Sequence, residues 1–225
     1  MTEFDQEQWD SLGRWTTQFN LPDVGRIGGD YDPDDYRMSL FREQVLCPGM
    51  NSLLELGSLE AGHTVLYAQK VPTVLTIEAR QENQARADYI KQLMGVTNVF
   101  SQVADLETLP QLPLVDVVSC IGVLYHMTEP QYLLERIAEA TDHLFLWTHL
   151  HFEGGECLPD TATETGAFYP EYGLGNRLSG TRDRAWWFTK EALLQELQKA
   201  GFTQLDILDE RENKERPVIT LNCRK

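Results

Sequence analysis

Short apolar runs alternate with amphipathic stretches along the middle of the chain, and this alternation indicates the fold class. The runs are rich in branched residues, as strands are, whereas the stretches between them carry apolar residues at the spacing of a helix face. Such a pattern is typical of βαβ units around a mainly parallel sheet. The sequence therefore predicts an α/β fold, with strands at residues 52–57, 73–79, 97–104, 114–122 and 143–150 and helices near residues 61–69, 81–94 and 130–140.

The pattern changes after the fifth predicted strand. Residues 151–188 are rich in glycine and aromatic residues and show no sustained period, so we expect a lid that covers a substrate. Helical spacing then returns, with Thr189 expected to cap a helix and Gly201 expected to end it. Two last strand candidates, residues 202–210 and 216–223, have no helix between them and should pair antiparallel. Together the candidates predict a seven-stranded, mainly parallel sheet with a C-terminal antiparallel strand pair.

The charge of the chain limits the classes of partner. Acidic residues outnumber basic ones by 35 to 19, which gives a formal net charge of -16. Such a charge repels phosphate backbones and anionic lipid, and so argues against nucleic acid and membranes as partners. Residues 1–10 lack the basic start and apolar stretch of a secretory signal, and no apolar run approaches transmembrane length, so a cytoplasmic protein is expected.

Three acidic residues stand at the ends of three consecutive predicted strands. In "LLELGSLEAGH" (53–63), Gly57 lies where the backbone must approach a ligand, and Glu55 would repel a phosphate but attract an ammonium group. Glu78 can accept hydrogen bonds from both hydroxyls of a ribose, and Asp105 can accept one from an exocyclic amino group such as that of adenine. A ligand with an amine, a ribose, an adenine and no phosphates is S-adenosylmethionine.

The order of these motifs over residues 50–150 resembles that of the class I methyltransferases, which use this cofactor. The segments that carry the resemblance are "LELGSLEAG", "LTIEA", "VADLE" and "VDVVSCIGVLYHMTEP". It implies the Rossmann-like class I methyltransferase fold and methyl transfer to an O or N atom of a small-molecule acceptor. The cofactor-binding residues that it implies are Glu55, Gly57, Ser58, Glu78, Ala79, Ala104, Asp105, Leu106, Ile121 and Gly122.

The glycine turn departs from the family pattern. The family usually has acidic-x-Gly-x-Gly-x-Gly, whereas Leu59 and Ala61 occupy the second and third glycine positions here. A shifted turn that uses Gly62 is one way to keep the site. A protein that binds adenosyl compounds without catalysis is the alternative that this change raises. A nicotinamide oxidoreductase is disfavoured, because the chain lacks G-x-G-x-x-G after the first strand.

The segment "GVLYHMTEP" (122–130) resembles three groups of enzymes. It is similar to a segment of bacterial enzymes that modify the wobble uridine of transfer RNA, and to bacterial methyltransferases of unknown substrate. A transfer-RNA-modifying enzyme therefore stays an alternative, although the net charge weighs against it. Ubiquinone-pathway O-methyltransferases carry two glutamates and a histidine there that bind a divalent metal. This chain has Gly122 and Tyr125 at the positions of those two glutamates. Of the three metal ligands it keeps only the histidine, His126, so no metal is expected.

The cofactor sets what the protein must supply. Its sulfonium is already activated, so the chain must hold the acceptor in line and exclude water. A hydroxyl or protonated amine also needs a base, for which His126 is the first candidate and His151 the second, whereas a carboxylate needs none. His149 and His151 are expected to point the same way from a strand end. The residues expected to bind the acceptor are Tyr125, His149, Arg182, Trp186 and Trp187; the alternative for the two tryptophans is that they pack the lid onto the sheet.

The domain organisation follows from length and motif order. The chain has 225 residues, which suits one domain. Within it we expect an N-terminal helical cap (1–50), a cofactor-binding core (51–150), a lid (151–188), and a C-terminal helix with a strand pair (189–225). A small molecule is the expected partner, and a homodimer is left open.

Overall fold

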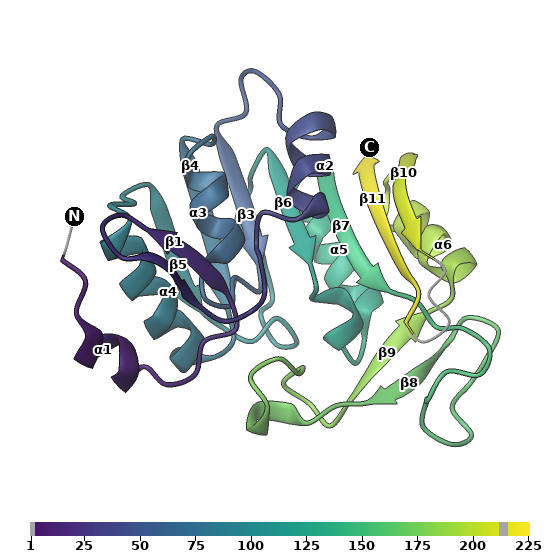
Figure 1. The fold of residues 1–225 in the computed structure, drawn as a ribbon. Helices are drawn as coiled ribbons and strands as arrows, with labels where there is room; N and C mark the ends of the chain where they lie inside the picture. The colour runs from purple at the N-terminus through teal and green to yellow at the C-terminus, as the bar shows by residue number, and fades with distance from the viewer. Residues whose placement is uncertain (1–2, 212–215) are drawn as a thin grey trace. The chain divides into compact units, whose positions relative to one another are not determined.

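The computed structural model describes residues 3–211 and 216–225, and the chain divides into two compact units, residues 1–104 and 105–225 (Figure 1). The predicted seven-stranded, mainly parallel sheet with its antiparallel C-terminal pair is confirmed. In sheet order its strands are β10 (Gln204–Arg211), β11 (Val218–Arg224), β7 (His143–His149), β6 (Val117–Ile121), β3 (Ser52–Leu56), β4 (Thr73–Glu78) and β5 (Val99–Val103).

The first unit holds β3, β4 and β5 as parallel neighbours. The register pairs Leu56 with Ile77 and Glu78 with Val103, so the carboxyl ends of the strands lie at one edge. Helices α3 (Gly62–Ala68) and α4 (Gln81–Leu93) follow β3 and β4 and pack against these strands, close to their predicted ranges. The acidic residues of the first two strand ends therefore share one edge, as the sequence predicts.

The segment predicted as a helical cap is only partly helical. Between α1 (Gln6–Ser11) and α2 (Tyr36–Gln44) it forms an antiparallel hairpin of β1 (Gln18–Leu21) and β2 (Gly25–Gly28), which the sequence analysis did not predict. Each strand has four residues, so the alternation in QFNL of β1 is short, and GRIG of β2 has a single apolar side chain; neither is enough to identify a strand.

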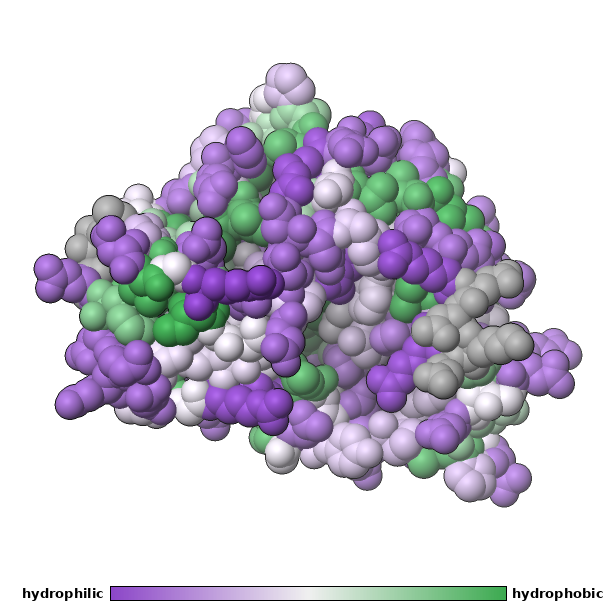
Figure 2. Space-filling view, viewed as in Figure 1, coloured by the Kyte–Doolittle hydropathy of each residue, from purple (hydrophilic) through white to green (hydrophobic). Residues whose placement is uncertain are grey.

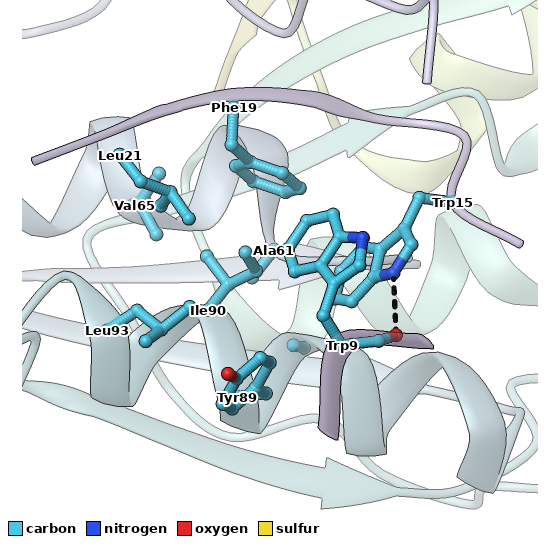
Figure 3. Close-up of a cluster of buried hydrophobic side chains, with 10 residues drawn as sticks. Trp9, Trp15, Phe19, Leu21, Ala61, Val65, Tyr89, Ile90 and Leu93 are labelled. Carbon is cyan, nitrogen blue, oxygen red and sulfur yellow. Dashed lines mark hydrogen bonds between the residues drawn. The ribbon is translucent and has the colours of Figure 1, made fainter. Parts of the chain in front are cut away.

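The N-terminal segment is anchored by a buried aromatic cluster (Figure 3). The rings of Trp9 and Trp15 are stacked, with centroids 3.9 Å apart and an angle of 11° between their planes. Phe19 meets Trp15 edge to face, and Ile90 and other residues of α4 complete the cluster. Burial of three large aromatic side chains fixes this segment to α4 within the first unit.

The second unit holds the other four strands of the seven-stranded sheet, together with the helices α5 (Pro130–Ala140) and α6 (Lys190–Ala200). β6 and β7 are parallel, whereas β11 pairs antiparallel with both β7 and β10. The Thr189 side chain accepts a hydrogen bond from the Ala192 amide, and Gly201 ends α6 with φ of 109°, so the predicted cap and stop are both confirmed.

Residues 151–188 are not irregular throughout, which corrects the expectation of a segment without period. They contain an antiparallel pair, β8 (Gly166–Pro170) and β9 (Arg184–Phe188), and a short 3-10 turn, η2 (Gly173–Gly175). Apolar residues lie on both faces of these strands, so the sequence shows no polar and apolar alternation. Whether the segment covers a substrate stays a prediction.

The surface agrees with the strongly charged composition. The face shown in Figure 2 is mostly hydrophilic. Within the described part of the chain, no helix has both the length and the apolar character needed to cross a membrane.

Candidate functional site

The turn after β3 keeps a left-handed backbone at the three positions where the family motif has glycine. Gly57 has φ of 70°, Leu59 of 49° and Ala61 of 67°. Gly62 instead begins α3, so the shifted turn that the sequence suggested is wrong. Left-handed backbone is unfavourable for residues with a Cβ atom, so other contacts must hold Leu59 and Ala61 in place.

Glu78 is one of these contacts. Its side chain is buried, its Oε2 accepts a hydrogen bond from the Leu59 amide at 2.9 Å, and its Oε1 accepts one from the Arg80 amide at 3.0 Å. The Asn83 side chain donates a third bond, to Oε1, at 3.2 Å. Burial raises the pKa of Glu78, against the opposing effect of these bonds. A carboxylate can accept about four hydrogen bonds, so Glu78 retains an acceptor position for the predicted ribose contact.

Glu55 lies near the end of β3, two residues before Gly57, and is also buried. The Thr64 hydroxyl donates a short hydrogen bond to its Oε2, and Nδ1 of His63 lies 4.0 Å from its Oε1. Burial raises the pKa of Glu55 to about 7, although the bond from Thr64 lowers it. An incoming ammonium group would favour the ionised form of this carboxyl, as the predicted role of Glu55 requires.

Ser58, which is predicted to bind the cofactor, is buried in the turn. Its side chain is 3% exposed, and its Oγ has no hydrogen-bond partner among residues 3–211 and 216–225. Buried hydroxyls are normally paired. The contact of Ser58 with the cofactor stays a prediction. Ala79 and Ala104 follow β4 and β5 and are half-buried, and the Ala104 amide donates to the Glu78 carbonyl at 3.0 Å.

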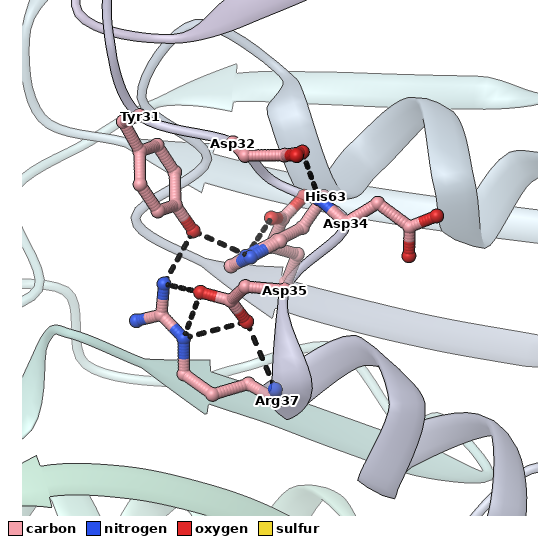
Figure 4. A network of polar contacts seen from close by, with 7 residues as sticks. Tyr31, Asp32, Asp34, Asp35, Arg37 and His63 are labelled. Atoms are coloured by element: carbon pink, nitrogen blue, oxygen red, sulfur yellow. Dashed lines mark hydrogen bonds and ion pairs between the residues drawn. The ribbon is translucent and has the colours of Figure 1, made fainter.

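A polar network borders the turn on the side of the N-terminal segment (Figure 4). The Tyr31 hydroxyl lies 2.8 Å from Nε2 of His63 and accepts a hydrogen bond from Arg37 at 2.6 Å. Arg37 also pairs with Asp35 at 2.6 Å. Burial lowers the pKa of His63 to about 3, which keeps its imidazole neutral. The sequence analysis missed these residues, because nothing local links residues 31–37 to residue 63.

In the second unit, Asp105 is already engaged by the protein. The Thr181 hydroxyl lies 3.2 Å from its Oδ1, and a nitrogen of Arg182 lies 3.0 Å from its Oδ2. Arg182, predicted to bind the acceptor, is thus paired with a residue predicted to bind adenine. Leu106 and Ile121 are buried, and Gly122 follows β6 with φ of 75°. These assignments stay predictions.

His126 forms a pair that the sequence analysis did not foresee. It ends the short turn η1 (Leu124–His126), and its Nδ1 lies 2.6 Å from Oε1 of Glu171. The other carboxylate oxygen of Glu171 accepts hydrogen bonds from the Ser179 hydroxyl and, at 2.9 Å, the Gly180 amide. Burial alone would raise the pKa of Glu171, but its bonds to His126, Ser179 and Gly180 outweigh this and hold the pKa below its usual range. Glu171 is therefore ionised at neutral pH.

Close packing fixes this arrangement. A Cβ atom built on Gly180 would lie 2.6 Å from the His126 carbonyl oxygen, so only glycine fits there. The Trp186 amide in β9 donates to the Met127 carbonyl at 2.8 Å. The segment that carries Glu171 is therefore held directly against the turn that carries His126.

Three predicted acceptor-binding residues gather beside His126. The centroid of the Tyr125 ring lies 4.1 Å from that of His126, 4.5 Å from that of His149 and 5.6 Å from that of Trp187. Trp187 is stacked between His149 and Tyr169, with centroid distances of 5.0 and 4.0 Å. Tyr125, His149 and Trp187 thus form an aromatic cluster that joins His126.

Trp186 does not join that cluster. Neighbouring residues of a strand point to opposite faces, and the Trp186 ring packs on Phe168 with centroids 5.0 Å apart. Its ring thus packs within the β8–β9 pair, and its contact with the acceptor stays a prediction.

His151 lies outside β7 and contacts Tyr169. Its Nδ1 is 3.0 Å from the Tyr169 hydroxyl, and burial lowers its pKa. It lines a cavity of about 770 Å³ with residues that include Phe152, Cys157 and Lys190. Over the residues that the structure describes, no three histidine, cysteine or acidic side chains gather as a metal site. Of the two candidate bases, His126 has an acidic side chain within hydrogen-bond distance, whereas His151 contacts Tyr169 and lines this cavity.

Comparison with solved structures identifies the family to which the chain belongs. No family model matches the chain, and no curated protein matches it. The N-terminal domain of EvdMO1, crystallised in the presence of S-adenosylhomocysteine (SAH) and D-fucose, is 30% identical with a TM-score of 0.82, over 97% of this chain and 94% of that one. The chain belongs to the class I S-adenosylmethionine-dependent methyltransferases.

Further structures agree with this assignment. The same EvdMO1 domain with SAH bound has a TM-score of 0.83 and 28% identity, over 100% of this chain and 98% of that one. Magnesium protoporphyrin IX methyltransferase (ChlM) from Synechocystis PCC 6803 with bound SAH shares the fold, with a TM-score of 0.58 and 19% identity, over 86% and 81% of the two chains. The methyltransferase fold and the cofactor, S-adenosylmethionine, are thereby confirmed.

Proposed function

We propose that this methyltransferase moves the methyl group of S-adenosylmethionine to a hydroxyl oxygen of a small molecule, with His126 as the base. The observation that carries the proposal is the 2.6 Å contact between His126 and the ionised Glu171. An O or N atom was the expectation from sequence. A base in this setting favours an acceptor that must lose a proton, and so argues for a hydroxyl over a carboxylate.

Glu171 gives His126 the form that a base needs. With its Nδ1–H donating to the carboxylate, the imidazole presents an unprotonated Nε2. When bound, S-adenosylmethionine would supply the methyl group from its sulfonium, which becomes a neutral thioether. His126 would take at Nε2 the proton that the acceptor hydroxyl loses, and the Glu171 carboxylate would stabilise the resulting imidazolium.

The aromatic cluster supports a ring-shaped acceptor. Trp187 is 8% exposed, and its indole N–H has no hydrogen-bond partner in the described part of the chain. It can therefore donate to an acceptor oxygen, while the face of Tyr125 supplies apolar surface. D-Fucose accompanied the related EvdMO1 domain in its crystal. We therefore propose a sugar, or a small molecule that carries one, as the acceptor.

For the cofactor we propose the turn of the first unit and the strand ends. Glu55, Gly57 and Ser58 would hold the methionine end, Glu78 and Ala79 the ribose, and Ala104, Asp105 and Leu106 the adenine. The buried, unpaired hydroxyl of Ser58 supports the first assignment. For Asp105 the proposal requires that the adenine amino group donate to its carboxylate, either in place of the Thr181 hydroxyl or beside it.

Two other functions are distinguished by experiment. The segment "GVLYHMTEP" favours a transfer-RNA substrate, and the replacement of two family glycines by Leu59 and Ala61 favours a non-catalytic adenosyl-binding protein. The test offers the enzyme S-adenosylmethionine with a panel of free sugars and glycosides, matched carboxylates, and transfer RNA, and reads each product by mass spectrometry. We expect methylated sugar hydroxyls and no methylated carboxylate. Methyl transfer to transfer RNA alone, or SAH binding without any product, would contradict the proposal.

A further inference from the structure

Two residues with side chains take the place of glycines in the cofactor turn, and the structure must keep them left-handed. Leu59 has φ of 49° and Ala61 of 67°. Glycine adopts such angles freely, whereas a residue with a Cβ atom does so only under restraint. The bond from the Leu59 amide to Glu78 restrains one side of the turn. The residue between Leu59 and Ala61 provides the other restraint.

That residue is Glu60, whose side chain is completely buried. Its Oε2 accepts hydrogen bonds from the amides of Thr16, at 2.9 Å, and Thr17, at 2.7 Å, and its Oε1 lies 3.0 Å from the Thr16 amide. Nε of Arg86 lies 4.0 Å from Oε1. A buried carboxylate is tolerated only with such partners, and bonds from backbone amides also fix its position.

The segment that supplies these amides is itself firmly packed. Trp15, next to Thr16, is stacked on Trp9 in the aromatic cluster of the first unit (Figure 3). A Cβ atom built on Gly62 would lie 2.8 Å from side-chain atoms of both Thr17 and Pro33, so the segment lies directly on the start of α3. Glu60 therefore connects the turn to a fixed support within the same unit.

We infer that Glu60 is a positioning residue for cofactor binding. By bonding to the amides of Thr16 and Thr17, it holds Leu59 and Ala61 in the left-handed backbone that glycine adopts unaided in related enzymes. The N-terminal segment is then part of the cofactor site rather than a separate cap. The inference rests on the proposal that the turn at Gly57 holds the cofactor.

The test compares the affinity for SAH of single and combined variants by calorimetry. Glu60→Gln keeps the shape of the side chain but removes its charge and one acceptor oxygen, so we expect SAH to bind about tenfold more weakly or worse. Leu59→Gly or Ala61→Gly added to Glu60→Gln should recover most of that affinity. Glycine relieves strain at a left-handed position, so denaturant unfolding of each variant is measured as well: a purely structural role of Glu60 predicts that affinity only follows stability, whereas a positioning role predicts that affinity recovers beyond it.

Two results would overturn the inference. One is unchanged affinity in Glu60→Gln, and the other is a weakened Glu60→Gln variant whose affinity neither glycine substitution improves. Circular dichroism checks that each variant folds. If Glu60→Gln does not fold either alone or with the glycine substitutions, Glu60 has a general role in folding and the inference is wrong.

A further variant separates this inference from the proposed function. Gly57 has φ of 70°, so Gly57→Ala strains the turn directly. If Gly57→Ala binds SAH as the wild type does, the turn is not the cofactor site, and the proposed placement fails with the inference. If Gly57→Ala loses affinity but the glycine rescue fails, only the role of Glu60 is wrong.

Discussion

The turn of the first unit and the His126 cluster of the second hold their carboxylates in different ways. Glu60 and Glu78 are buried and accept hydrogen bonds mainly from backbone amides. Glu171 bonds the side chains of His126 and Ser179 and a single amide, and comes from the segment 151–188. Backbone amides are fixed by the fold, whereas side chains can rotate. The turn is therefore held mainly by backbone groups of the first unit, whereas the His126–Glu171 pair depends on side chains and on the position of the segment 151–188.

This difference has a functional consequence. A fixed region suits a constant ligand such as the cofactor, and a region assembled from a segment suits an acceptor that must enter and leave. Substitutions in the turn should therefore change cofactor affinity, and substitutions around His126 should change turnover. The variants below test that division, from the largest expected effect to the smallest.

The largest effect is expected for His126→Ala. Loss of a general base should lower kcat by about 10²–10⁴-fold, while the Kd for SAH stays unchanged. Steady-state kinetics with a methylated sugar as product, together with calorimetry, measure both quantities. His143→Ala is the matched control, because His143 lies at the start of β7 and bonds Asn222. Equal losses in the two variants would show that His126 acts through the fold.

The next largest effect is expected for Glu55→Gln, on how the free energy of unfolding depends on pH. The pKa of Glu55 is raised to about 7 in the folded chain, so the folded state binds the proton more tightly than the unfolded state. This contribution to stability is present below the unfolded pKa of about 4.5 and is lost as the pH rises towards 7. Glu55→Gln should therefore gain stability relative to the wild type between pH 5 and pH 8, by roughly 2–3 kcal/mol in denaturant unfolding. A difference that does not vary with pH would contradict the assigned environment.

A smaller loss is expected for Glu171→Gln. The amide keeps its size but cannot stabilise an imidazolium, so kcat should fall about 10–100-fold, less than in His126→Ala. Glu164→Gln, at an exposed position of the same segment, is the control. A loss of kcat no larger than that of Glu164→Gln would mean that Glu171 does not support the base.

The smallest effect is expected for Glu78→Ala. Loss of the bonds to ribose and to the Leu59 amide should weaken SAH binding about tenfold, without unfolding the domain. Glu82→Ala, an exposed glutamate in the first turn of α4, should bind SAH as the wild type does. Unchanged affinity in a calorimetric titration of Glu78→Ala would remove Glu78 from the cofactor site.

The sequence is informative where structure is determined locally. The strand that ends at Leu56, the helices α4 and α5 and the cap at Thr189 follow from patterns of a few residues, and the structure confirms them. The family was also recognisable, because its motifs keep their order along the chain. Leu59 and Ala61 could be identified as departures, but not the backbone that they adopt.

The missed features depend on distant residues. Glu60 bonds residues 43 and 44 positions away, and Glu171 bonds a residue 45 positions away, so no local pattern reveals either. The pairing of β8 with β9 was missed because both strands are apolar on both faces. The contact of Trp186 with Phe168 was missed for the same reason, since the direction of a side chain depends on the strand that contains it.

A crystal structure with SAH and a sugar acceptor tests the central claim most directly. The measured quantity is the distance between Nε2 of His126 and the acceptor oxygen that becomes methylated. We predict about 2.6–3.2 Å, the reach of a general base, with Glu171 still bonded to Nδ1. An acceptor oxygen beyond that reach and next to another base, such as His151, would contradict the account.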